Sequence, residues 1–118
     1  MSLWKVREGL EFDIQMDDVE FQERYEDAFE KMGETEKVLQ KTGKLSEISR
    51  GYCEMFYNLF DDIFGAGSGE KIFDGRKNTT LCDEIYDSFI EHCSSEAKRI
   101  NAARQKIVNK YTPKKGRK

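Results

Sequence analysis

The chain has 118 residues and a net charge of −3, with 37% hydrophobic residues, 36% charged residues and a single proline. This length suits one domain, and so many charged residues with so few helix breakers favour helices over a sandwich of short strands. The absence of any run of 18 apolar residues excludes a transmembrane helix, and the eight phenylalanines and five tyrosines argue against a disordered acidic chain.

A β-hairpin is predicted at residues 4–15. Apolar and polar residues alternate there on both sides of Glu8-Gly9, a pair that suits a tight turn. Two strands alone are marginal in water, so the apolar face of the hairpin is expected to pack on a helix or to extend another sheet.

The first helix should begin at Asp17 or Asp18, because either carboxylate can cap the free N–H groups of its first turn. Apolar residues at helical spacing give this helix one stripe, and acidic residues fill most of its other face. Gly33 could weaken the helix, whereas Thr42-Gly43 is the stronger stop signal.

A second helix is predicted from about Leu45 to Phe64, since apolar residues keep helical spacing for five turns. The stripe is wider than a single buried face requires, so this helix should be central and packed on two sides. Its members are Leu45, Ile48, Tyr52, Met55, Phe56, Leu59, Phe60 and Ile63.

A glycine-rich break follows, and Gly65, Gly67 and Gly69 are the candidate hinge. A short turn over residues 70–73 should lie between this break and the last helix. The last helix is expected to be capped by Thr79 or Thr80. Its apolar seam contains Leu81, Ile85, Phe89, Cys93 and Ala97, continued by Ile100 and Ile107.

The predicted fold is mainly α, with a short N-terminal β-hairpin packed on a bundle of about three long helices and a glycine-rich break before the last. Residues 4–112 should form this single helical domain, because Pro113 marks the outer limit of the last helix. Residues 113–118 are predicted to be a disordered basic tail.

None of the candidate catalytic or metal-binding residues has the spacing or the partners that such a site requires. His92 has no second histidine, and Cys93 beside it points about 100° away on a helix. Asp61 and Asp62 diverge in the same way and should lie on a solvated helix edge. The stretch from Gly65 to Lys71 lacks both the glycine and the hydroxyl residue of a phosphate-binding loop, and a helix precedes it instead of a strand. We therefore expect no catalytic residue, no metal and no cofactor.

Three cysteines in no tight motif suit reduced thiols in a cytoplasm better than a disulfide framework. The charge distribution is more distinctive, because residues 98–118 contain nine basic residues and no acidic one. This candidate basic interaction surface consists of Lys98, Arg99, Arg104, Lys106, Lys110, Lys114, Lys115, Arg117 and Lys118.

The basic residues allow three interpretations. They could neutralise phosphates of a nucleic acid, although the acidic remainder of the chain would repel a polyanion. They could form a solvated helix end, which the helix dipole favours. They could also contact an acidic protein surface, including the acidic first helix of another copy.

One long segment carries a resemblance to a known family. It runs from Phe60 to Asn78 and is similar to the "FFDDxFGEGTxEKIFGG" core of small uncharacterised proteins encoded by phages and prophages of Gram-positive bacteria. Residues 23–31 match an "ERYEEAxEK" segment of that family, and residues 110–114 match a "KYSPxR" ending. Ala66 and Asp74 depart from the family, which often has Glu and Gly at these positions.

The family resembles the tail assembly chaperones and minor tail-associated proteins of long-tailed phages. The resemblance implies a non-enzymatic assembly protein in the cytoplasm of the bacterial host. Its partners would be a tape-measure protein, a tail-tube subunit or another copy of itself, and no membrane would be involved. The alternative is a small nucleic-acid-binding or regulatory protein that uses the basic C-terminal helix.

Overall fold

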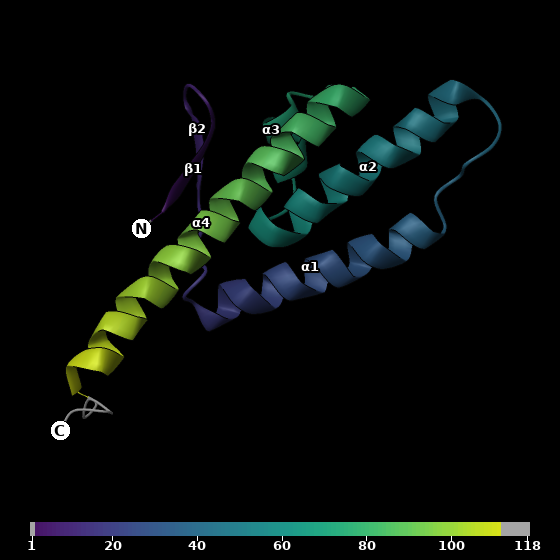
Figure 1. Ribbon diagram of the computed structural model, residues 1–118. Coiled ribbons are helices and arrows are strands. Elements are labelled where there is room, and N and C mark those ends of the chain that lie inside the picture. Colours follow the sequence, from purple (N-terminus) through teal and green to yellow (C-terminus); the bar gives the residue numbers. More distant parts are fainter. Residues whose placement is uncertain (1, 112–118) are drawn as a thin grey trace.

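A two-stranded antiparallel hairpin precedes four helices in the computed structural model, which describes residues 2–111 (Figure 1). The mainly helical fold with an N-terminal hairpin is confirmed. The predicted disordered tail at residues 113–118 lies outside the described residues. The elements are β1 (Leu3–Arg7), β2 (Leu10–Asp13), α1 (Val19–Lys37), α2 (Leu45–Phe64), α3 (Ser68–Phe73) and α4 (Thr79–Tyr111).

The hairpin turns at Glu8-Gly9, where Gly9 has a φ of 86° that favours glycine. Trp4 faces Phe12 across the ladder, and its side chain is buried against the helices. The indole N–H of Trp4 donates a hydrogen bond to the Ser88 hydroxyl of α4 at 3.0 Å. The apolar face of the hairpin therefore packs on a helix, as its pattern predicts.

Helix α1 begins at the predicted cap, because the Asp18 carboxylate accepts a hydrogen bond from the Phe21 N–H at 3.1 Å. It continues through Gly33 and ends at Lys37, before the predicted stop at Thr42-Gly43. The Arg24 guanidinium donates to the Ile63 carbonyl at 3.1 Å, so α1 satisfies one free carbonyl at the end of α2.

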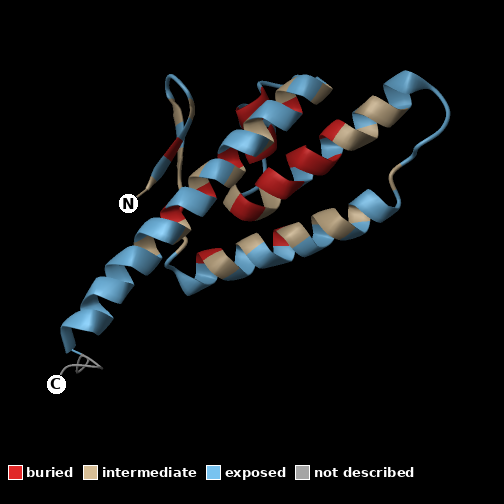
Figure 2. Ribbon diagram, viewed as in Figure 1, coloured by how far each residue is buried: buried red, intermediate tan, exposed pale blue. Residues whose placement is uncertain are grey.

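Helix α2 occupies the predicted range and lies at the centre of the fold, packed against α1, α3 and α4. Its aromatic residues meet those of the hairpin and α4. The Phe60 ring stacks on Trp4 at 5.6 Å and meets Phe89 edge-on at 5.1 Å, both measured between ring centroids. The main core thus contains an aromatic cluster at the junction of the hairpin, α2 and α4. Figure 2 shows the buried residues concentrated on α2, α3 and the part of α4 that faces them.

A fourth helix, α3, occupies the segment in which the sequence predicted only a short turn. The residues before it have positive φ angles, 112° at Gly65 and 91° at Gly67. Its other end is held by the hairpin, because the Arg7 guanidinium donates to the carbonyls of Lys71 and Ile72. These carbonyls belong to the last turn of α3, where the partial negative charge of a helix end favours a cation.

Helix α4 is 33 residues long and gives the molecule its elongated shape. Its cap is the side chain of Asn78, which accepts from the Leu81 N–H at 2.9 Å; the predicted caps Thr79 and Thr80 are wrong. The radius of gyration is 18.4 Å, against about 13 Å for a compact chain of this length. Residues 101–111 are all exposed and project beyond the body (Figures 1 and 2).

Candidate functional site

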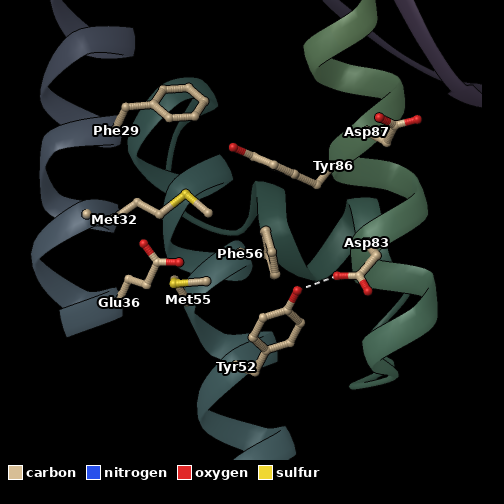
Figure 3. A pocket seen from close by; sticks show the side chains of 10 residues that line it. Phe29, Met32, Glu36, Tyr52, Met55, Phe56, Asp83, Tyr86 and Asp87 are labelled. Carbon is tan, nitrogen blue, oxygen red and sulfur yellow. Dashed lines mark hydrogen bonds between the residues drawn. The ribbon is translucent and has the colours of Figure 1, made fainter. Parts of the chain in front are cut away.

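A groove between α1 and α4 is the candidate binding site. Helix α1 lies on one side of α2 and α4 on the other, and the part of α2 between them forms the floor (Figure 3). The hollow has a volume of about 580 Å³. Its lining consists of Phe29, Met32, Gly33 and Glu36 from α1, Tyr52, Met55 and Phe56 from α2, and Asp83, Tyr86 and Asp87 from α4.

The walls of the groove come from residues at helical spacing. On α1, Phe29, Met32 and Glu36 lie three and four positions apart and therefore share one face. On α4, the half-buried Tyr86 points into the same space and packs on Phe56 of the floor at 5.0 Å between ring centroids. Apolar side chains thus line the depth of the groove, but no element of residues 2–111 covers them.

The groove continues toward the loop between α1 and α2. A second hollow of about 370 Å³ adjoins the first and shares Tyr52 and Asp83 with it. It adds apolar walls from Leu39 and Ile48 and one cation, Lys41. We use "the groove" for both hollows together.

Carboxylates give the groove an acidic rim. Glu36, Asp83 and Asp87 are all exposed, and the Asp83 carboxylate accepts a hydrogen bond from the Tyr52 hydroxyl (Figure 3). This hydrogen bond, helped by burial, raises the pKa of Tyr52 to about 12. Burial, with a smaller effect of Glu36, also raises the pKa of Tyr86. Both tyrosines are neutral at pH 7, and the carboxylates supply the negative charge.

Only five of the nine residues of the predicted basic surface lie within the described part of the chain. Lys98, Arg99, Arg104, Lys106 and Lys110 are exposed on the projecting part of α4, and Arg99 pairs with Glu96 one turn earlier. The remaining four residues, Lys114, Lys115, Arg117 and Lys118, lie outside the described residues. We call residues 98–111 "the basic end".

The basic end also has apolar side chains that are exposed, although the sequence predicted one of them to be buried. Ile107 was predicted to continue the buried seam of α4, but 60% of its surface is exposed. Val108 and Tyr111 are exposed as well, at 45% and 75%. The prediction failed because the other helices are too short to reach this part of α4, which no periodicity within α4 reveals.

A family model described as a family of unknown function, DUF6673, matches residues 8–118. The chain belongs to this family. No curated protein and no solved structure matches the chain significantly. Among the described residues, the DUF6673 match covers β2 and all four helices, and therefore every residue of the groove and of the basic end.

The three glycines of the candidate hinge in this DUF6673 chain differ in their surroundings. Gly65 and Gly67 are exposed and have positive φ angles, and a Cβ at either position would meet nothing within 4 Å. Gly69 is buried against α2, and its N–H donates to the Asp61 carboxylate at 2.7 Å. A Cβ on Gly69 would lie 2.6 Å from the Tyr57 carbonyl oxygen, so glycine is needed there for close packing.

Asp61 and Asp62 do not form the solvated edge that their sequence predicted. Both are half-buried, and Asp61 binds the first turn of α3 through the Gly69 N–H. Asp62 pairs with Lys31 of α1 at 3.2 Å. These carboxylates connect α2 to its neighbours.

His92 has a partner that sequence reasoning missed, because the two residues are 90 positions apart. Its Nε2 lies 2.7 Å from the Ser2 hydroxyl oxygen. A nucleophilic triad also needs a carboxylate that orients the imidazole from its other nitrogen. The carboxylate nearby, Glu96, accepts a hydrogen bond from Arg99 instead. The polar cluster joins the start of the hairpin to α4.

The cysteines are buried thiols. Burial raises the pKa of Cys93 to about 12, and burial together with a hydrogen bond to Cys53 does the same for Cys82. At pH 7 these two side chains are protonated and therefore poor nucleophiles. Within residues 2–111, no three His, Cys, Asp or Glu side chains are grouped as a metal site would require. None of the helices in this range is long and apolar enough to cross a membrane.

Proposed function

We propose that this DUF6673 protein is non-enzymatic and acts in phage or prophage assembly by binding other proteins, as a tail assembly chaperone or minor tail-associated protein. The observation that carries the binding role is the groove: an open apolar floor with an acidic rim is the form in which proteins receive an amphipathic helix. The assembly role rests on the resemblance of residues 23–31, 60–78 and 110–114 to phage and prophage proteins.

In this proposal the three longer helices form the binding unit. Helices α1 and α4 are the walls, α2 is the floor, and the glycine-rich break after Phe64 lets the chain turn so that α4 can lie beside α2. The partner is a tape-measure protein or a tail-tube subunit, which the protein holds in the cytoplasm of the bacterial host before assembly.

Co-expression tests the proposal. The wild-type protein should co-purify with the tape-measure or tail-tube protein of the same genome and increase its soluble yield. Met32→Lys places a charge on the α1 wall of the groove and should reduce the co-purified fraction about tenfold. Val19→Lys is the matched control, because it makes the same kind of change on α1 at an exposed residue outside the groove. If the wild type neither retains nor solubilises either protein, the proposal fails.

A second candidate function is nucleic-acid binding through the basic end. Arg104, Lys106 and Lys110 favour it, since all three are exposed on the part of α4 that projects from the acidic body. A mobility-shift assay over a range of salt concentrations separates the two functions. Binding that weakens steeply with salt and disappears when residues 98–118 are removed would support this second function.

A further inference from the structure

The basic end has an apolar side that no other element of residues 2–111 covers. Ile100, Ile107 and Tyr111 are separated by seven and four positions, so they lie along one face of α4. Ile107 and Tyr111 are 60% and 75% exposed. A helix end with such a face is stable in water only marginally, and it gains free energy when an apolar surface covers it.

The charges of the basic end are opposite to those of the groove. Residues 98–111 include five cationic side chains and no acidic one. The groove rim has the exposed carboxylates of Glu36, Asp83 and Asp87, with Lys41 as the cation among its described lining residues. A helix that places its apolar face on the floor would bring its flanking cations close to these carboxylates.

The lengths of the two surfaces also agree. Residues 100–111 of α4 span about 17 Å at 1.5 Å per residue. The wall of the groove extends from Phe29 of α1 to Leu39, two residues beyond the end of the helix. Its helical part, Phe29 to Lys37, spans about 12 Å by the same measure. The groove is therefore long enough for most of the basic end.

The basic end cannot reach the groove of its own chain. Helix α4 is continuous from Thr79 to Tyr111, and its first turns, which contain Asp83 and Tyr86, form one wall of that groove. We infer that the groove receives the basic end of a second copy, so that copies of this protein associate head to tail. Such a contact joins two different surfaces, and it therefore produces open chains or closed rings instead of isolated two-fold dimers.

Sedimentation equilibrium of the full chain tests this inference. The mass should exceed the monomer mass of 13.8 kDa, rise with protein concentration and fall with added salt. Glu36→Lys/Asp87→Lys, which we call the groove variant, should weaken association at least tenfold. Removal of residues 101–118 should do the same, since the described residues of that segment are exposed and contribute little to the fold.

Mixing the two altered proteins is the decisive experiment. The groove variant retains an intact basic end, and the shortened chain retains an intact groove, so an equimolar mixture should form a complex of one copy of each. Ile107→Ser should weaken association of the full chain, whereas Gln105→Ser on another face of α4 should not. Glu23→Lys/Glu34→Lys is the control for the groove variant, with the same charge change at exposed α1 residues outside the groove.

Three results would overturn the inference. A wild-type chain that stays monomeric at all concentrations would show that the groove serves another partner or none. A groove variant that associates as well as the wild type would indicate contacts between two basic ends. A mixture that remains monomeric would show that the two surfaces do not bind each other. The inference does not depend on the phage assembly role, because every measurement uses this protein alone.

Discussion

At the scale of single residues, Gly69 and Gly33 are both helical glycines with opposite surroundings. A Cβ on Gly69 would lie 2.6 Å from the Tyr57 carbonyl oxygen, whereas a Cβ on Gly33 would meet nothing within 4 Å. Gly69→Ala should lower the free energy of unfolding by about 1–3 kcal/mol, because backbone must move to admit the methyl group. Gly33→Ala should raise it by about 0.5–1 kcal/mol through helix propensity.

Urea denaturation followed by circular dichroism at 222 nm measures both glycine changes. Equal effects of the two substitutions would contradict the close packing of α3 on α2. A stabilised Gly69→Ala variant would show that the segment moves freely, as a hinge would.

Glu96 makes the stability of the protein depend on pH. A hydrogen bond from Ser2 and the hydrogen bond and charge of Arg99 hold the pKa of this buried carboxyl below its usual value of 4.5. A group with a lowered pKa in the folded state stabilises the fold above its unfolded pKa, and this contribution is lost as the pH falls through the folded pKa. The free energy of unfolding should therefore decrease as the pH falls below 4.5.

Glu96→Gln checks this pH dependence. The variant should be less stable than the wild type at neutral pH, and the difference should shrink as the pH falls below 4.5 and the carboxylate of the wild type becomes protonated. Urea midpoints over this range provide the measurement. A difference that persists unchanged in acid would show that Glu96 acts through packing and not through its charge.

At the scale of elements, the two halves of α4 should differ in local stability. Residues 82–96 include buried positions such as Phe89 and Cys93, whereas residues 101–111 are exposed throughout. Amide hydrogens in the exposed part should exchange many times faster, because no packing opposes local opening. Hydrogen–deuterium exchange should be measured on the groove variant, so that association does not protect the basic end. Equal protection along the whole helix would contradict the exposed position of the basic end.

Several elements could be predicted because their signals are local. The alternation around Gly9 indicates the hairpin, the apolar stripe of α2 gives its range, and Asp18 caps α1 as expected. The predictions failed where contacts distant in sequence decide the outcome. Helix α3 is stabilised by Arg7, 64 and 65 residues away from the carbonyls that it binds.

The groove also depends on distant contacts, so only its parts could be found from the sequence. Helical spacing assigns Phe29 and Met32 to an apolar face of α1, which would normally indicate a buried position. They remain half-covered because α1 and α4 both contact α2 but leave an open hollow between them, and one sequence does not show how helices are arranged. The sequence shows the positive charge of the basic end, but it does not show that the side chains of residues 101–111 are exposed.

At the scale of the whole molecule, Phe89 of α4 contacts aromatic residues from β1, α1 and α2. Its ring lies 5.1 Å from those of Trp4 and Phe60 and 6.3 Å from that of Tyr25, measured between centroids. Phe89→Ala should therefore lower the free energy of unfolding by about 3–5 kcal/mol. Tyr111→Ala is the control on the same helix and should change it by less than about 0.5 kcal/mol, since Tyr111 is exposed. Similar effects in urea denaturation would disprove a shared core.

The position of Trp4 has an optical consequence. It is the only tryptophan of the chain, it is 2% exposed, and its ring lies between the hairpin and the two helices that form the main core. Its fluorescence therefore comes from one site, with an emission maximum at the short wavelengths of an apolar environment. Detachment of the hairpin alone would shift this emission to the red while the helical signal remained. The protein thus contains its own fluorophore for following the docking of its first two strands.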